Sequence, residues 1–301
     1  MIASSIRAQA VIALFALNLC CGNALAGMTR EEVASFESNI RLAEHGDRIA
    51  QYNVGVQYEN GLGVQQDFIK AAIWYKKSAD QGYASAQFNL GACHRSGRGV
   101  KTDEVDAISW FRKAAEQGHA KAQYNLGIIY CDGKGVEDHS MALAWFQKAA
   151  EQGLGLAINN MGTCYERGIG VEVNQAKAFL WYERAAKHGI STAQYNVGLC
   201  YENGRGVSKD IAKAVEFYRL ASDQGHPGAQ NNLGVCYADG KGVTKNMIEA
   251  YALYALAAPA RENSKANLEA LNSELSQIEI ELGKRRALEL KKEITAKQAG
   301  K

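Results

Sequence analysis

Small, aliphatic and aromatic residues recur at every fourth position in short stretches of the chain, and polar residues fill the positions between them. One such stretch carries Ala122, Leu126 and Tyr130. This i, i+4, i+8 spacing places the three residues on one stripe of an α-helix. A second stretch follows, in which the ring of Phe146 stands between two alanines, each four residues away. The pattern therefore predicts pairs of amphipathic helices whose rings and alanines pack together.

The helix pair is repeated along the chain with a nearly constant period. A Gly-x-Gly-Val sequence separates the two stretches six times, at intervals of 36, 36, 35, 36 and 36 residues. The six copies begin at Gly61, Gly97, Gly133, Gly168, Gly204 and Gly240. A fixed period in this range is typical of stacked helical repeats. We therefore predict an all-α solenoid of six helix-turn-helix repeats over residues 46–258.

Glycine has two predicted structural roles within each repeat. The first glycine of Gly-x-Gly-Val suits a left-handed C-terminal helix cap. Another glycine follows the aliphatic residue inside every first helix, as Gly127 follows Leu126. Because glycine destabilises a helix interior by about 1 kcal/mol relative to alanine, we expect the backbone of a neighbouring helix to pass close to it. The single-residue deletion in the third repeat is expected between Gly135 and Trp145, in the loop or the first turn of the second helix.

Both ends of the repeat array are predicted to be covered by helices. Residues 27–45 should form an N-terminal capping helix, because Thr29 and Glu32 have the spacing of a capping box. Residues 259–301 should form the C-terminal cap and tail, with a helix that starts at Asn263 or Ser264. A second helix over 277–297 is expected to place three apolar positions on one side: Ile278, Leu282, and either Leu288 or Leu290.

The first 26 residues have the composition of a cleavable signal peptide. Arg7 supplies a positive charge, residues 8–21 are mostly apolar, and Ala24-Leu25-Ala26 matches an A-x-A cleavage site. No later stretch is apolar enough to predict a transmembrane segment. We therefore expect an exported protein that is periplasmic or secreted.

The charge and the chemistry of the side chains exclude several classes of function. The formal net charge is only +2 and no basic run is present, so a nucleic-acid-binding surface is not expected. The six histidines are scattered, and no nucleophile–base, paired-carboxylate or metal-ligand motif is found, so no catalytic residue, metal site or cofactor is predicted. Gly-x-Gly follows a predicted helix rather than a strand, which argues against phosphate binding.

Five cysteines remain after the predicted signal peptide. Four of them occupy one repeat position, and Cys131 lies two residues later in its own repeat. Equivalent helices pack about 9–10 Å apart, whereas a disulfide requires Cα atoms within about 7 Å. We interpret the cysteines as small core residues and predict no disulfide, with a ladder of disulfides as the alternative.

An asparagine at one position of every first helix is the main candidate for binding. It lies just before the aliphatic–glycine pair in all six repeats: Asn53, Asn89, Asn125, Asn160, Asn196 and Asn232. A carboxamide is both donor and acceptor, so this asparagine ladder either ties neighbouring helices together or grips the backbone of a peptide. Tyr124 and Tyr195 are aromatic candidates one residue before the ladder, but Asn159 and Asn231 interrupt that aromatic row and are expected to meet a polar group of the partner.

The repeats resemble the Sel-1-like repeat family, which is related to tetratricopeptide repeats. The resemblance rests on Ala122 to Tyr130 (Ala-x-x-x-Leu-Gly-x-x-Tyr), on Gly-x-Gly-Val, and on Lys177 to Ala186 (Lys-Ala-x-x-Trp-Tyr-x-x-Ala-Ala). It implies a right-handed α/α superhelix whose first helices line a concave face that holds a protein or peptide partner, here in the cell envelope. It also implies two alternatives: a β-lactam-binding or β-lactamase-like protein, and a periplasmic regulator of a membrane sensor kinase. The paired cysteines of the β-lactamase-like members, about eight residues apart, are missing from this chain.

Overall fold

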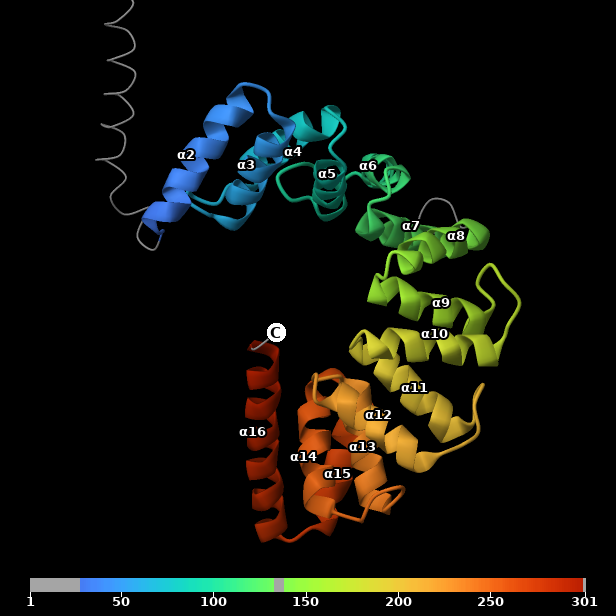
Figure 1. Ribbon diagram of the computed structural model, residues 1–301. Helices are drawn as coiled ribbons and strands as arrows, with labels where there is room; N and C mark the ends of the chain where they lie inside the picture. Colours follow the sequence, from blue (N-terminus) through green and yellow to red (C-terminus); the bar gives the residue numbers. More distant parts are fainter. Residues whose placement is uncertain (1–27, 133–137, 300–301) are drawn as a thin grey trace, which may run out of the picture. The chain divides into compact units, whose positions relative to one another are not determined.

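The described part of the computed structural model, residues 28–132 and 138–299, is entirely helical (Figure 1). It contains fifteen α-helices and one short 3₁₀ helix. The first helices of the six repeats are α3 (Arg48–Asn60), α5 (Ala84–Ser96), α7 (Ala120–Asp132), α9 (Gly155–Arg167), α11 (Ser191–Asn203) and α13 (Pro227–Asp239). The second helices are α4 (Phe68–Asp80), α6 (Glu104–Glu116), α8 (His139–Glu151), α10 (Gln175–Lys187), α12 (Ile211–Ser222) and α14 (Met247–Ala257).

The chain divides into two compact units between Leu126 and Gly127. Within each unit, a first helix packs against the second helix of its own repeat, as α3 packs against α4 and α11 against α12. Each second helix then packs against the next first helix, as α4 does against α5 and α12 against α13. The predicted all-helical repeat fold is therefore confirmed.

Side chains and glycines define where the repeat helices begin and end. The residue before every second helix is aspartate or asparagine, and its side chain accepts a hydrogen bond from the backbone of the first turn, as Asp67 does from Lys70. Five first helices end at a left-handed glycine, among them Gly61 (φ 71°). These five caps confirm the prediction, while Gly133 and the predicted deletion region up to residue 137 lie outside the described residues.

The glycine inside each first helix faces an aromatic ring of the second helix. A Cβ on Gly162 would lie 2.5 Å from the Tyr182 ring, and a Cβ on Gly91 would lie 2.9 Å from the Phe111 ring. The equivalent rings are nearly all fully buried, as Tyr182 is at 1% exposure. The expected close approach is present, but a ring makes the nearest contact. The backbone carbonyl of the second helix lies slightly farther away, 3.2 Å from a Gly91 Cβ.

The N-terminal helix α2 (Arg30–Glu44) begins with the predicted capping box. Thr29 accepts from the Glu32 backbone at 3.2 Å, and the Glu32 carboxylate accepts from the Thr29 backbone at 2.7 Å, which completes the capping box.

The C-terminal end differs from the prediction in two respects. Helix α15 (Glu262–Glu274) begins after Arg261 with no side-chain cap, because the predicted cap Ser264 is buried and donates to Asn231 instead. Helix α16 (Gln277–Ala299) packs along α14 through Gly283, which meets the ring of Tyr251. Three of the residues named for the predicted apolar positions are exposed, at 75% for Ile278, 40% for Leu282 and 62% for Leu288. Only Leu290 packs into the core.

Candidate functional site

The asparagine ladder lies in the second turn of the six first helices, and every member is half-buried. Each unit holds three members: Asn53, Asn89 and Asn125 in the first, and Asn160, Asn196 and Asn232 in the second. Because the helices are parallel equivalents of one repeat, the sequence period alone places these side chains at the same point of each helix. Their hydrogen bonds then decide whether the amides are consumed inside the fold.

Tyrosine hydroxyls lie beside two of the ladder amides. The Asn89 side chain is close enough to the hydroxyls of Tyr52 and Tyr75 to lower the pKa of each, against the larger increase that burial causes. In the sixth repeat, Nδ2 of Asn232 donates to the Tyr218 hydroxyl at 3.3 Å. The Tyr195 hydroxyl also lies close to the Asn232 side chain. The residue just before the ladder in one repeat therefore contacts the ladder asparagine of the next repeat.

The same connection is made by asparagine where the aromatic row is interrupted. Nδ2 of Asn196 donates to Oδ1 of Asn159 at 3.2 Å, and Asn159 is 9% exposed. Asn231, 7% exposed, accepts from Ser264 at 2.9 Å and from Asn267 at 3.2 Å. The expectation that Asn159 and Asn231 meet a polar group of a partner is wrong, because both are buried and bonded inside the fold.

Asn267 on α15 extends the ladder by one member. It lies 35 residues after Asn232, and its bond to Asn231 repeats the bond of Asn196 to Asn159. Sequence reasoning missed this residue, although the repeat period could have revealed it. Helix α15 therefore packs on the last repeat with the same asparagine contact that a first helix makes to the repeat before it.

The remaining ladder amides keep unused hydrogen-bonding groups. Oδ1 of Asn125 accepts from the Arg95 guanidinium at 3.2 Å, and Oδ1 of Asn160 accepts from Asn159 at 3.5 Å. A carboxamide has two N–H donors besides its acceptor oxygen, and neither Nδ2 donates to a described residue. The side chain of Asn53 makes no hydrogen bond within the described part of the chain. These three half-buried amides can bind a ligand without breaking a strong internal contact.

A second set of carboxamides, the glutamine ladder, lies two residues earlier on the same helices. It comprises Gln51, Gln87, Gln123, Gln194 and Gln230, all buried. Nε2 of Gln87 donates to the carbonyl of Ala79 in the preceding repeat at 3.2 Å, and its Oε1 accepts from Nε2 of Gln117 at 2.7 Å. Gln51 makes the equivalent pair of bonds. Sequence reasoning missed this ladder, whose signal is one glutamine position in five of six repeats.

The fourth repeat replaces both partners of the glutamine bond together. It has the fully buried Ile158 at the ladder position and His188 where the donor glutamine lies in other repeats. This paired replacement avoids leaving a buried carboxamide without its partner. The glutamine ladder is therefore part of the packing between helices.

Carboxylates inside the array bond to the ring tyrosines. The Tyr75 hydroxyl donates to Glu59 at 2.5 Å, and the Tyr182 hydroxyl donates to Glu166 at 2.8 Å. Arg205 from the next repeat pairs with Glu166 at 2.8 Å. Burial raises the pKa of Tyr75, and the Glu59 carboxylate adds to the increase. These glutamates have structural partners, which argues against a role as free acid or base.

Aromatic stacking fixes the edge of the ladder. The His226 ring stacks on Tyr195 with ring centres 4.7 Å apart, and its Nδ1 accepts from the backbone of Ala229. Burial, followed by the charge of Arg261, lowers the pKa of His226. Burial raises the pKa of Tyr195. Tyr195 is half-buried beside Asn232, and the other predicted aromatic, Tyr124, is half-buried directly before Asn125.

Other chemistry has little support in the described residues. Cys93, Cys164, Cys200 and Cys236 are free and buried, as expected of core residues, and Cys131 is half-buried. Burial raises the pKa of the Cys164 thiol to about 12, which disfavours the reactive thiolate. No group of three or more His, Cys, Asp or Glu residues in the described ranges is placed to hold a metal ion. No described helix is both long enough and apolar enough to cross a membrane.

Comparison with known proteins identifies the repeat. The Sel1 repeat model matches six consecutive segments: 48–83, 84–119, 120–154, 155–190, 191–226 and 227–258. A Sel1 repeat protein from Oxalobacter formigenes is 32% identical, with a TM-score of 0.68 over 74% of this chain and 96% of that one. A protective antigen present in uropathogenic Escherichia coli strains is 35% identical, with a TM-score of 0.59 over 86% of this chain and 63% of that one. No curated protein matched the sequence. The chain belongs to the Sel1 repeat family, with six repeats.

Proposed function

We propose that this protein is an exported, non-catalytic scaffold that binds a protein or peptide partner through the first helices of its repeats. One observation carries the proposal: half-buried asparagines recur at one point of every first helix, and three of them have unused hydrogen-bonding groups. Membership of the Sel1 repeat family supports protein binding in general terms. The Arg7–Ala26 leader pattern supports export.

The ladder amides suit the backbone of an extended peptide. Each residue of such a peptide presents one N–H and one carbonyl, and a carboxamide can bond to both. Contacts with Arg95 and with Asn159 restrict the Asn125 and Asn160 side chains before any ligand arrives. Restricting a side chain in advance lowers the entropy that binding must remove. The proposed recognition is therefore of backbone, with sequence preference supplied by neighbours such as Tyr124 and Tyr195.

A binding experiment with matched variants tests the proposal. The protein, expressed with its own leader, is used to capture partners from envelope extract, and the partner's direct binding is then titrated. The test variant replaces Asn53, Asn125 and Asn160 with alanine, because these residues make the fewest internal bonds. The control variant changes three exposed second-helix residues to alanine: Lys76, Arg112 and Gln147.

We expect the asparagine variant to lose the partner while its helicity and melting temperature match those of the wild type. The control variant should bind like the wild type. Equal partner affinity in the two variants would contradict the proposal. A β-lactam reporter substrate tests the β-lactamase-like alternative. Binding or hydrolysis of this substrate by the wild type would favour that alternative over the scaffold.

A further inference from the structure

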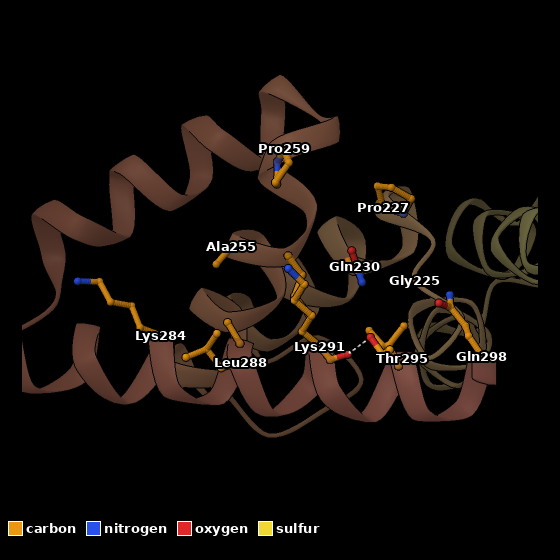
Figure 2. A pocket seen from close by; sticks show the side chains of 13 residues that line it. Gly225, Pro227, Gln230, Ala255, Pro259, Lys284, Leu288, Lys291, Thr295 and Gln298 are labelled. Carbon is orange, nitrogen blue, oxygen red and sulfur yellow. Dashed lines mark hydrogen bonds between the residues drawn. The ribbon is translucent and has the colours of Figure 1, made fainter. Parts of the chain in front are cut away.

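A groove runs between α16 and the helix pair α13 and α14 in the second unit (Figure 2). Its volume is about 570 Å³, which lies within the range of ligand-binding pockets. Leu256 and Pro259 line one side, and Leu288 and Ile294 of α16 line the other. The groove shares no residue with the asparagine ladder, so its role is separate from the function proposed above.

Gln230, a member of the glutamine ladder, lies in this groove with an unpaired carboxamide. Figure 2 shows its side chain between α16 and the two prolines, Pro227 and Pro259. The residue is only 3% exposed, yet its side chain makes no hydrogen bond to any residue in the described ranges. Gln230 is not among the described residues whose fully buried polar atoms lack a partner, so its amide faces the groove and the water in it. The groove therefore presents a carboxamide that a ligand can bind in place of water.

Other repeats show which group fills this position. Oε1 of Gln51, Gln87 and Gln194 accepts from the Nε2 of a second glutamine at 2.8, 2.7 and 2.7 Å, respectively. The donors are Gln81, Gln117 and Gln224, each at the end of its repeat. In the sixth repeat the corresponding residue is Ala260, directly after Pro259. Gln230 has lost its donor because the last repeat ends in Pro-Ala instead of Gln-Gly.

The positive charges of the groove are complementary to the acidic residues that precede the donor glutamines. An acidic residue precedes each donor glutamine: Asp80, Glu116 and Asp223. Two lysines, Lys284 and Lys291, line the groove. Lys284 pairs with Glu281 at 2.9 Å, whereas Lys291 makes no ion pair within the described part of the chain. A ligand with a carboxylate beside its carboxamide would meet a free ammonium group here.

We propose that this groove binds a segment of a partner polypeptide in which an acidic residue directly precedes a glutamine. The glutamine Nε2 donates to Oε1 of Gln230, and the acidic carboxylate pairs with Lys291. An apolar side chain of the same segment covers Leu256 and Leu288. A second copy of this chain is a poorer occupant, because its own Gln81, Gln117 and Gln224 already donate inside their repeats.

Fluorescence anisotropy with a short peptide tests the site. The probe is the labelled, end-capped peptide Arg-Lys-Ala-Ala-Glu-Gln-Gly-His, which has the sequence of residues 112–119. A matched peptide carries methionine in place of its glutamine, and another carries glutamine in place of its glutamate. The protein is expressed with its own leader, and sedimentation checks that it does not self-associate through the groove.

We expect the methionine peptide to bind at least about tenfold more weakly than the probe, since it cannot donate to Gln230. Gln230→Met should remove that difference, and it should not lower the melting temperature because it removes an unpaired amide. Lys291→Gln should weaken the binding of the probe and leave unchanged the affinity for the peptide that carries glutamine in place of its glutamate. As a control, Gln194→Met should lower the melting temperature and leave the discrimination between the two peptides intact.

Several results would overturn the proposal. These are equal affinity of the probe and the methionine peptide, an undiminished difference in Gln230→Met, or no binding of the probe at all. Self-association that Gln230→Met abolishes would make a second copy the occupant instead. Loss of probe binding in the Asn53, Asn125 and Asn160 alanine variant, with Gln230→Met unaffected, would place the peptide on the asparagine ladder.

Discussion

Two rows of carboxamides run along the same first helices, and their different surroundings are the basis of the different roles that we propose for them. The glutamine ladder is buried, and Gln87 bonds to both the preceding repeat and the end of its own repeat. The asparagine ladder, two residues later, is half-buried, and Asn125 makes a single bond to Arg95. The chemical group is the same in both. Burial and the number of internal partners therefore separate a structural amide from one available to a ligand.

The difference in burial and bonding also accounts for which residues occupy each ladder position from repeat to repeat. A buried carboxamide is costly without its partner, so repeat four replaces both Gln partners together, with Ile158 and His188. The asparagine position is asparagine in all six repeats, although Asn53 makes no internal hydrogen bond in the described part of the chain. Packing alone gives no reason for an asparagine there. The binding role that we propose would give one.

The largest effect on stability is expected from breaking the glutamine ladder. Gln87→Ala removes two hydrogen bonds and the packing of a buried methylene group, which contributes about 0.8 kcal/mol, while the Ala79 carbonyl keeps its bond from Gly82. We expect the free energy of unfolding to fall by roughly 2–4 kcal/mol. Urea denaturation followed by circular dichroism measures the loss, and hydrogen exchange between α4 and α5 locates it.

A double substitution provides the control for that prediction. Gln87→Ile combined with Gln117→His installs the pair that repeat four carries, and it should recover part of the stability lost in Gln87→Ile alone. A Gln87→Ala protein as stable as Asn125→Ala would show that the two ladders do not differ.

The sequence predicts the helices that carry the two ladders but not the difference in burial between the ladders. The 36-residue period and the i, i+4, i+8 spacing give the helices, and the Gly-x-Gly-Val copies give the left-handed caps. The glutamine ladder was missed because a buried polar residue leaves no trace in a hydrophobic pattern; only its contacts, such as Gln87 to Ala79, show its role.

The ends of the array were harder to predict for a related reason. Outside the repeat there is no second copy to indicate which face of a helix is covered. For helix α16, three positions were therefore predicted on one side, and of the residues named for them Ile278, Leu282 and Leu288 are exposed while Leu290 packs against the core. Gly283 lies against the ring of Tyr251, where a side chain would not fit. A glycine adds nothing to a hydrophobic pattern, so this contact could not be predicted from the sequence.

A buried asparagine should behave like a member of the glutamine ladder. Asn231 accepts from both Ser264 and Asn267, which attaches α15 to the last repeat. We expect Asn231→Ala to cost about 1–3 kcal/mol because the Ser264 hydroxyl is left buried without a partner. Hydrogen exchange should show α15 opening before α13, and an unchanged exchange rate in α15 would contradict this account.

The edge of the asparagine ladder should respond to pH in the acidic range. The folded-state pKa of His226 is lowered, so the unfolded chain binds its proton more readily and stability falls as pH drops below the ordinary value of 6.5. His226→Asn, which keeps an acceptor for the Ala229 backbone, should reduce this dependence between pH 7 and pH 5. Denaturation midpoints at several pH values measure it, with His139→Asn on the exposed start of α8 as the control. An equal reduction in both variants would mean that burial of His226 is not the cause.

The smallest effect on stability is expected at the asparagine ladder itself. Asn125→Ala removes one bond to an exposed arginine, and alanine is a better helix former than asparagine. We expect a change within about 0.5 kcal/mol, measured by the same urea denaturation. A loss comparable to that of Gln87→Ala would make this ladder structural as well.

The most direct test of the account measures affinity and stability on the same protein. The partner or peptide selected by the wild type is titrated by calorimetry into the variant with alanine at Asn53, Asn125 and Asn160, alongside urea denaturation of both proteins. The account predicts at least about a tenfold loss of affinity, or about 1.4 kcal/mol, at nearly unchanged stability. Unchanged affinity, or a loss of binding that merely follows a loss of folded protein, would contradict it.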